Sequence, residues 1–470
     1  MDSDALQFAG EYELENILIK SVNGVELDFK QLNLELNIYE GIYENTIYGT
    51  ITLRDSANHI QYMPIIGQEE IRFLLKTPSF SDTINFREYK GRIYKVTNQM
   101  RTIEREQVYT LHFMTQESLD NTRTRLSRAF TDTPSNIVKN VLQNTIRTDK
   151  PLFIEDTKSV HKIVSPNLRP FDLISMLKKR SESKFYDTPG YLFFENHRGY
   201  HFRSYESLSY NGFEPRPHVW EFYDSIYTKT DEGVRVVDVD LSTIEKYDFI
   251  RTNDLVANTI TGMLSSTHYT HDIHTKSWTK TEYQYFNNFD KTKHTDEREI
   301  SKQNFGAFYS RTPETLDGKT VADFSKSKIY VSPRATKLHS QTASDPREYD
   351  NRSNFWLQKM RSNQLSYDNL KLKLELPGNC SIAAGDVIYV TIPSLEPMND
   401  TTADIVDKLY SGRFIVAHIR HIFNSNRHSM VIEAIKDDFF TSIASLESKN
   451  IDDYSQQYQA VSVNTDNDAS

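Results

Sequence analysis

The fold is decided by two stretches of sequence, Gly91-Arg92-Ile93-Tyr94-Lys95-Val96 and Gly412-Arg413-Phe414-Ile415-Val416-Ala417. Each follows an apolar strand that starts after a glycine and ends at a proline, Pro78 in one case and Pro393 in the other. After each Gly-Arg pair the two segments stay in step without a gap, and the same alternate positions remain apolar. The sequence therefore predicts an internal duplication of a β-rich unit over residues 67–117 and 385–438.

Glycines stand at corresponding points of the two copies. We interpret Gly67, Gly91, Gly385 and Gly412 as backbone turns rather than as chemical groups. Any two hairpins with glycine turns match loosely, because strand patterns are degenerate. Here spacing, turn position and apolar face agree together, which favours a true repeat. Tyr109, Leu111 and Phe113 are expected to correspond to Met430, Ile432 and Ala434.

Hydrophobic periodicity changes along the chain. From Tyr12 to about Thr115 the apolar residues alternate with polar ones, as in half-buried strands. Thr133-Pro134 is a helix start, and a second helix is expected near Pro170. Residues 191–203 read as a hairpin that turns at Arg198-Gly199. A helix is also expected around Trp356, ahead of a strand at 370–376.

These patterns predict an α+β fold, mainly β, with two tube-like β-barrel domains, a small α/β domain and an irregular insertion. The expected divisions are a first tube-like domain at 1–117, an α+β domain at 118–210, an irregular and β region at 211–375 with its insertion at 287–352, a second tube-like domain at 376–445 completed by strands from 240–285, and a disordered tail at 446–470.

Composition limits the possible functions. The 470 residues include 55 Lys and Arg against 65 Asp and Glu, a net charge of -10 that argues against a sequence-independent nucleic-acid binder but not against a lumen through which DNA passes. The single cysteine, Cys380, excludes an intramolecular disulfide. The acidic start Met1-Asp2-Ser3-Asp4 has no apolar signal-peptide core, and no apolar run approaches the ~18 residues of a membrane span.

Candidate chemical motifs do not form a site. His268, His271 and His274 lie three apart, so on a strand they cannot converge on one metal ion, and an exposed polar strand is the simpler interpretation. His418 and His421 likewise point to opposite faces of a strand. No phosphate loop, His-Glu-x-x-His or nucleophile elbow is present, and the carboxylates are scattered. The sequence predicts no catalytic, cofactor-binding or metal-ligating residue, and hence no enzyme.

A basic stretch, Arg123-Thr124-Arg125-Leu126-Ser127-Arg128, is compatible with a contact to an acidic partner or with a solvated helix start or linker. Neither interpretation involves catalysis.

Duplication has a geometric consequence. Two similar modules per chain and three chains per ring give six similar positions, which is the symmetry needed to join a sixfold tube to a threefold object. Strand edges would then close on the neighbouring chain. The candidate contacts between chains are Leu34, Leu36 and Ile38 on one strand and Leu370, Leu372 and Leu374 on another.

The order of the motifs resembles that of the central baseplate hub of T4-like contractile-tailed bacteriophages. The resemblance covers about residues 10–440 and is carried by Gly49-Thr50-Ile51-Thr52-Leu53-Arg54-Asp55-Ser56, Arg169-Pro170-Phe171-Asp172-Leu173-Ile174, Tyr191-Leu192-Phe193-Phe194-Glu195, Pro377-Gly378-Asn379-Cys380-Ser381-Ile382 with Gly385-Asp386-Val387, and Tyr410-Ser411-Gly412-Arg413-Phe414-Ile415-Val416. It implies a homotrimer between the tail tube and the membrane-puncturing spike, with other baseplate proteins as partners and DNA leaving through its lumen. The expected location is the virion tail, after assembly in the bacterial cytoplasm.

Two other functions compete with this one. A peptidoglycan-degrading tail enzyme would clear cell-wall substrate and lose that activity when one Asp or Glu is replaced. A host-binding adhesin is suggested by the Tyr- and Trp-rich polar stretch at 278–290, and it would bind host cells as an isolated chain.

Overall fold

The computed structural model describes residues 5–103, 106–186, 188–210, 219–224, 237–273, 275–296, 306–311, 318–334, 353–394, 406–407 and 409–439. Strands dominate this part of the chain and helices are few, which confirms the mainly β, α+β fold class. The predicted C-terminal tail and much of the predicted insertion lie outside the described residues. No described helix has both the length and the apolar character that crossing a membrane requires.

The first module is a sheet with the strand order β3-β4-β8-β7-β5-β1-β2, in which β6 also pairs with β5. Its elements are β1 (Glu13–Lys20), β2 (Glu26–Asp28), β3 (Asn33–Gly41), β4 (Tyr48–Asp55), α1 (His59–Tyr62), β5 (Glu70–Lys76), β6 (Thr83–Asn85), β7 (Gly91–Ile103) and β8 (Glu106–Thr115). Alternate residues of these strands, such as Ile51, Phe73 and Leu111, are fully buried in one core. The predicted run of strands is thereby confirmed.

The second module repeats this arrangement with the strand order β16-β20-β23-β22-β21-β14-β15. Its elements are β14 (Trp220–Asp224), α6 (Val237–Leu241), β15 (Thr243–Ile244), β16 (Lys246–Arg251), β20 (Leu370–Pro377), β21 (Val387–Thr391), β22 (Gly412–Asn424) and β23 (His428–Lys436). Four strands therefore come from the region before residue 378. Within residues 240–285, β15 and β16 join this module, whereas the later strands β17 and β18 form a separate sheet.

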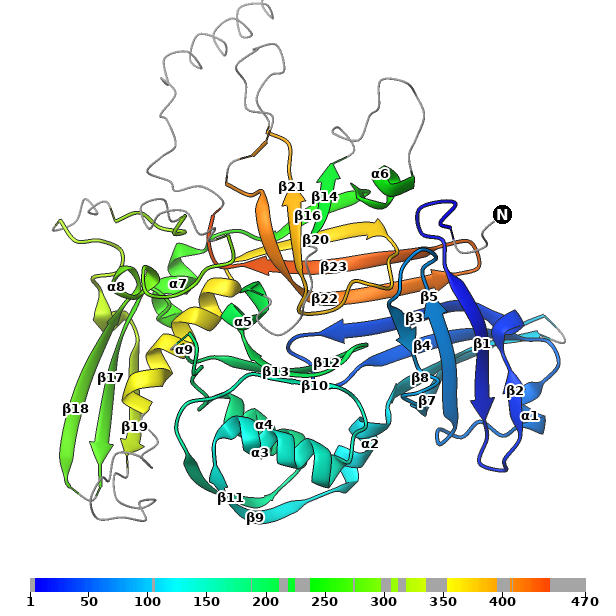
Figure 1. Ribbon diagram of the computed structural model, residues 1–470, viewed down its shortest axis with the longest axis horizontal. Coiled ribbons are helices and arrows are strands. Elements are labelled where there is room, and N and C mark those ends of the chain that lie inside the picture. Colours follow the sequence, from blue (N-terminus) through cyan, green and yellow to red (C-terminus); the bar gives the residue numbers. More distant parts are fainter. Residues whose placement is uncertain are drawn as a thin grey trace, which may run out of the picture.

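The α/β domain hangs below the joined sheets in Figure 1. It comprises α2 (Gln116–Arg123), β9 (Leu126–Asp132), α3 (Pro134–Asn140), β10 (Leu152–Ile154), β11 (His161–Leu168), α4 (Pro170–Lys178), β12 (Tyr191–Asn196), β13 (Gly199–Ser204) and α5 (Tyr205–Tyr210). Helices α3 and α4 pack between the sheet β10-β13-β12 and the pair β9-β11 (Figure 1). Both predicted helix starts and the hairpin are confirmed, and the Thr133 side chain accepts a hydrogen bond from the Asn136 amide as an N-cap.

A separate sheet, β18-β17-β19, lies at the opposite end of the molecule from the first module (Figure 1). It consists of β17 (Ser265–Asp272), β18 (Ser277–Gln284) and β19 (Ile329–Arg334), flanked by α7 (Leu255–Thr261), α8 (Tyr285–Phe289) and α9 (Ser353–Tyr367). The helix expected around Trp356 is thus α9. Strand β19 pairs in parallel with β17, so the described part of the predicted insertion is not wholly irregular.

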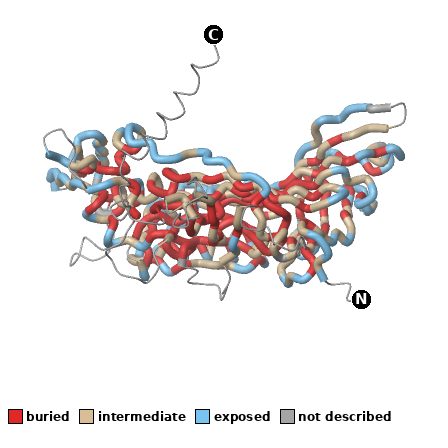
Figure 2. Tube along the Cα trace, turned by 90° about the horizontal axis from the view of Figure 1, so that it is seen from above, coloured by how far each residue is buried: buried red, intermediate tan, exposed pale blue. Residues whose placement is uncertain are grey.

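The two modules share one sheet. The first residues of β22 pair with β21, and its later residues, His418–Asn424, pair antiparallel with Glu35–Gly41 of β3. We call this pairing of β22 with β3 the seam. It makes the sheets of the two modules continuous, with both hydrophobic cores on the same side of the joined sheet. Figure 2 shows that buried residues fill the body, while the far half of β7 is exposed.

The duplication is visible in the strand order, with one correction to its alignment. Ile93 lies opposite Phe113 in the first copy. The ungapped match would place Phe414 opposite Ala434, but Val416 holds that position. A shift of two residues keeps the same side chains on the same face, because the period of a strand is two. The sequence therefore predicted which side chains share a face of the sheet, but not which residue lies opposite which on the neighbouring strand.

Candidate functional site

The seam between the modules shows how two such units join. Arg420 on β22 donates a hydrogen bond to the Asn37 side chain of β3, with 3.0 Å between Nε and Oδ1. Its guanidinium also lies 3.5 Å from the Glu35 carboxylate and 5.7 Å from the centre of the Tyr39 ring. Tyr39 stacks in turn on Tyr48 of β4. Backbone pairing, a charge pair and a cation–π contact thus stabilise the seam together.

Besides the terminal strands β2, β6 and β15, one longer strand in each module has an open edge. Beyond Arg92, β7 has a strand partner on its β8 side alone among the described residues. Strand β16 pairs with β20, and the described residues supply no strand for its other side. Apolar side chains are exposed at both edges: Met100 is 63% exposed and Ile250 is 52% exposed. Open edges with exposed apolar residues are typical of strands that pair with another chain.

The two open edges correspond to the two strands of the seam. In strand order, β7 occupies the place that β22 holds in the second module, and β16 occupies the place that β3 holds in the first. The edge of β22 that pairs with β3 is therefore equivalent to the open edge of β7.

The strands predicted for contacts between chains already have neighbours on both sides. β3 lies between β4 and β22, and β20 lies between β16 and β23. Their apolar side chains fill the chain's own cores, apart from one that is 38% exposed: Leu34 is the exposed residue, and Leu36, Ile38, Leu370, Leu372 and Leu374 are buried. Neither strand therefore has a free edge for pairing with another strand.

The four repeat glycines have different environments. Gly67 and Gly385 both adopt a left-handed backbone, with φ of 91° and 89°, at the same point before the first strand of each copy. Gly412 has φ of 124°, and a Cβ there would contact the Asp296 carboxylate. Gly91 stands at the start of β7, where a Cβ would lie 2.7 Å from the Ile71 side chain.

Each copy ends in a buried carboxylate that meets a buried cation. In the first copy, Glu117 accepts a hydrogen bond from Lys150 at 2.8 Å, and Lys150 also pairs with Glu195. In the second copy, His294 donates to Asp437 at 2.7 Å. The sequence shows the acidic residues at the ends of both copies. It does not show their partners, which lie far from them along the chain.

Residues 294–296 cover the acidic end of the second copy, where Asp437 lies. Asp296 accepts a hydrogen bond from Lys436 at 2.8 Å, and the amide and hydroxyl of Thr295 both donate to Asp437. Burial lowers the pKa of His294, but the Asp437 carboxylate more than compensates and raises it to about 9. This part of the predicted insertion is a buried strap across the second module.

A cluster of histidines lies where the two modules and the α/β domain meet. His421 and His428 are fully buried, and their rings share a hydrogen bond of 3.1 Å. Glu40 on β3 pairs with His197 at 3.0 Å. Burial lowers the pKa of His421 to about 4, although the Glu40 carboxylate acts in the opposite direction. His418 lies on the other face from His421, as predicted, and is not part of this cluster.

The remaining predicted motifs are structural. His268 is fully buried and hydrogen-bonds to Ser332 at 2.8 Å, so the expectation of an exposed strand is wrong at that position. His274 lies outside the described residues. Helix α2 ends at Arg123 and β9 begins at Leu126, so the basic stretch is not a helix start. Among the described residues no group of three or more potential ligands could hold a metal ion.

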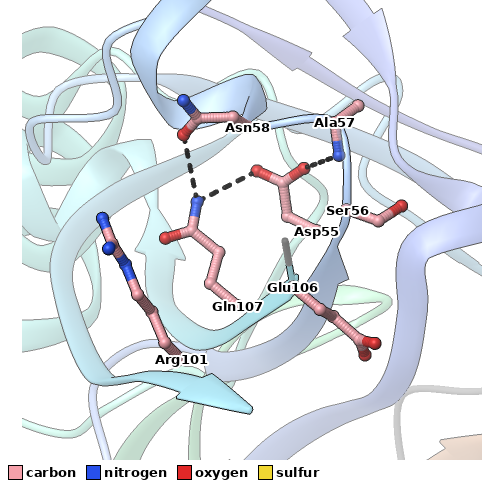
Figure 3. A pocket seen from close by; sticks show the side chains of 7 residues that line it. All are labelled: Asp55, Ser56, Ala57, Asn58, Arg101, Glu106 and Gln107. Carbon is pink, nitrogen blue, oxygen red and sulfur yellow. Dashed lines mark hydrogen bonds between the residues drawn. The ribbon is translucent and has the colours of Figure 1, made fainter. Parts of the chain in front are cut away.

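A polar cavity of about 330 Å³ lies beside the end of β4, at the end of the β7–β8 hairpin where β7 stops and β8 begins (Figure 3). Its two carboxylates, Asp55 and Glu106, do not resemble the acid and base of a glycosidase. Asp55 accepts hydrogen bonds from the Ala57 and His59 amides, and Glu106 pairs with Arg54. Burial raises the pKa of Asp55, but its hydrogen bonds lower it more, so this carboxyl is held ionised. A general acid needs the opposite shift.

Comparisons with known proteins give structural neighbours only. No protein-family profile matches the sequence, and no curated protein sequence matches it. A tail protein from Neisseria meningitidis MC58 aligns with a TM-score of 0.49 and 9% identity, covering 91% of this chain and 98% of that one. The 43 kDa tail protein of prophage MuSo2 from Shewanella oneidensis aligns at 0.47 and 8% identity, covering 90% and 100%.

A third neighbour is the E. coli c3393 protein, described as a component of the type VI secretion system with structural similarity to the T4 tail proteins gp27 and gp5. It aligns with a TM-score of 0.36 and 10% identity, covering 91% of this chain and 76% of that one. Similarity at this level does not assign the chain to a family or give it a function.

Proposed function

We propose that this chain is the structural hub of a contractile phage tail. Three copies form a ring of six β modules that joins the sixfold tail tube to the threefold cell-puncturing spike, and DNA passes through the lumen. The role is assembly geometry rather than catalysis. Spike, tube and other baseplate proteins are its partners in the virion.

The observation that carries this proposal is the match between the seam and the two open edges. Within one chain, β22 of the second module pairs with β3 of the first. The equivalent strands β7 and β16 have open edges, so the same joint can form between chains, head to tail. A head-to-tail joint closes into a ring when its rotation is an integral fraction of a turn. The motif order described above, which resembles the phage hubs, favours three chains.

Disulfide cross-linking tests the joint. Met100→Cys on β7 is combined with Ile250→Cys on β16, and, to find the register, with Asp248→Cys. We expect oxidation to give a covalent species of three times the 54.8 kDa chain mass, and the same native mass for the unmodified protein without oxidation. The native Cys380 is buried and should not interfere.

The matched control pairs Met100→Cys with Val256→Cys, which is 68% exposed on α7 but is not expected to meet β7. This pair should give only the background of random cross-links. A stable native monomer, or equal cross-linking in the control, would contradict the proposed ring.

A further inference from the structure

The continuous sheet has a second face, opposite the two cores. It extends over eight strands in the order β16-β20-β23-β22-β3-β4-β8-β7. Pairing registers place on this polar face the residues that alternate with the core positions, for example Lys373, which lies opposite Asp248 and Glu433. If the ring forms as proposed, β7 of one chain continues into β16 of the next, and this face becomes a continuous lining.

The polar face carries many charges, and the structure pairs nearly all of its cations. The cations are Arg54, Arg92, Lys95, Lys246, Arg251, Lys371, Lys373 and Arg420. Their ion pairs are Arg54–Glu106, Arg92–Glu70 at 3.4 Å, Lys246–Asp248 at 3.4 Å, Arg251–Asp368 at 2.7 Å, Lys371–Asp368 at 2.6 Å, Lys371–Glu433 at 3.5 Å, Lys373–Glu375 at 3.1 Å and Arg420–Glu35 at 3.5 Å. Of the eight cations, Lys95 alone has no ion pair within the described residues.

The uncharged positions between these pairs are mixed: Thr50, Thr52, Thr97 and Thr110 carry hydroxyls, whereas Tyr39, Tyr48, Val108, Met114 and Val431 are larger and aromatic or apolar. Thr52 and Thr110 lie side by side with 3.2 Å between their Oγ1 atoms, and Thr97 hydrogen-bonds to His112 at 2.7 Å. Burial, with the nearby Lys95 ammonium, holds the pKa of His112 below its ordinary value, so this imidazole adds no positive charge at neutral pH. The face is therefore close to neutral, with hydrogen-bonded polar groups beside apolar and aromatic ones.

Retention of duplex DNA depends on unpaired cations. A protein binds the phosphate backbone because Lys and Arg side chains displace condensed counterions, and each such contact adds to the affinity and to its salt dependence. A cation already paired with a carboxylate releases no counterion unless that pair first breaks. A lumen lined by such ion pairs therefore presents hydrated polar groups to DNA but no unpaired cations that bind its phosphates.

We infer that the polar face is a sliding surface for duplex DNA, and that the carboxylates Glu35, Glu375 and Glu433 prevent its retention by neutralising Arg420, Lys373 and Lys371. This inference rests on the proposed ring, because only the ring turns the face into a lumen. The net charge of -10 would repel DNA from the chain as a whole, whereas the local pairs leave this face nearly neutral.

The test replaces the three carboxylates. The variant Glu35→Gln/Glu375→Gln/Glu433→Gln removes the ion pairs of Arg420 and Lys373, leaves Lys371 paired with Asp368 alone, and keeps the side-chain shapes. Binding of a fluorescent 30-base-pair DNA duplex is measured by anisotropy from 50 to 200 mM NaCl. We expect no measurable binding to the unmodified protein, and salt-dependent binding to the variant with a log–log slope of up to about -1.8 for two phosphate contacts.

The matched control changes the net charge by the same amount elsewhere. Glu13→Gln/Glu26→Gln/Glu88→Gln removes exposed carboxylates of the first module that are not on the polar face, and it should not create binding. Adding Arg420→Gln, Lys371→Gln and Lys373→Gln to the first variant should abolish its binding. Strong binding by the unmodified protein, or binding by both triple variants, overturns the inference.

Native mass measured in the same buffer separates this inference from the proposed function. A trimer whose carboxylate variant fails to bind DNA leaves the ring standing and overturns the sliding surface. A monomer whose variant binds as expected supports the role of the pairs and counts against the ring.

Discussion

Lys150 has a side chain that is only 4% exposed, and two carboxylates compensate its charge. It bonds to Glu117 on α2 and to Glu195 on β12. Glu195 also accepts hydrogen bonds from the Ile47 amide and the Thr115 hydroxyl of the first module, so this group links that module to the α/β domain. Burial lowers its pKa, but the carboxylates more than compensate, and the net shift is upward. The ammonium is therefore charged at neutral pH. Removing one member of such a buried group leaves the others uncompensated.

Replacing Lys150 with methionine should destabilise the protein strongly. Lys150→Met leaves Glu117 and Glu195 buried beside each other, and we expect a loss of about 3–5 kcal/mol in the free energy of unfolding. Lys20→Met, at an exposed position on β1, should cost less than about 0.5 kcal/mol. Chemical denaturation of both variants compares the two losses.

A compensated variant tests the cause. Lys150→Met/Glu117→Gln/Glu195→Gln removes the uncompensated charges and should recover most of the lost stability. If it is no more stable than Lys150→Met, packing rather than charge accounts for the effect.

At the scale of elements, sequence patterns predicted what is local. Alternation predicted the strands up to Thr115, and Thr133-Pro134 and Pro170 predicted α3 and α4, because capping and periodicity are properties of neighbouring residues. The partners of β22 and β19 could not be predicted in this way, since pairing joins segments hundreds or tens of residues apart. The open edges were missed for the same reason: an open edge is defined by the whole sheet.

Close packing between strands gives a test at this scale. A Cβ on Gly49 of β4 would contact the Phe113 ring and lie 2.5 Å from the backbone oxygen of Asn37 on β3. The backbone of β3 is held by pairing on both sides and cannot retreat. We expect Gly49→Ala to lower stability by about 1–3 kcal/mol, measured as a shift in thermal midpoint.

The comparison is Gly24→Ala. No atom lies within 4 Å of the position of its Cβ, so the cost there is only that of a left-handed backbone, about 1 kcal/mol. A Gly49→Ala protein with an unchanged thermal midpoint would show that β3 and β4 can separate locally.

At the scale of the whole molecule, buried histidines link the domains and make stability depend on pH. His421, whose pKa is about 4, lies beside the seam, and His294, whose pKa is about 9, lies in the strap across the second module. In the unfolded chain both titrate near pH 6.5. The two shifts have opposite signs, so they act on opposite sides of that pH.

We expect the contribution of these two groups to be greatest near pH 6.5. Below pH 6.5 the histidine binds a proton in the unfolded chain, whereas His421 in the folded protein stays neutral down to its pKa of about 4. The free energy of unfolding therefore falls from pH 6.5 to 4. Above pH 6.5 the charged pair of His294 and Asp437 is lost as pH rises through about 9. Each loss is on the order of a few kcal/mol. Denaturation midpoints between pH 4 and 9 measure both.

Single substitutions show which histidine causes the acidic limb and which causes the alkaline limb of the pH–stability curve. His421→Gln should flatten the acidic limb, and His294→Gln should flatten the alkaline limb. Unchanged curves for both variants would mean that other groups control the pH dependence.

The seam between β3 and β22 also sets an order of events during synthesis. Residues 35–41 leave the ribosome several hundred residues before their partner, residues 418–424. At roughly 5–20 residues per second, β3 waits tens of seconds with one edge bare. A nascent chain in that state can pair with the wrong strand and is a natural client for chaperones. The first module cannot gain this strand partner before β22 has been synthesised, so the folding of the first module is coupled to the translation of the second.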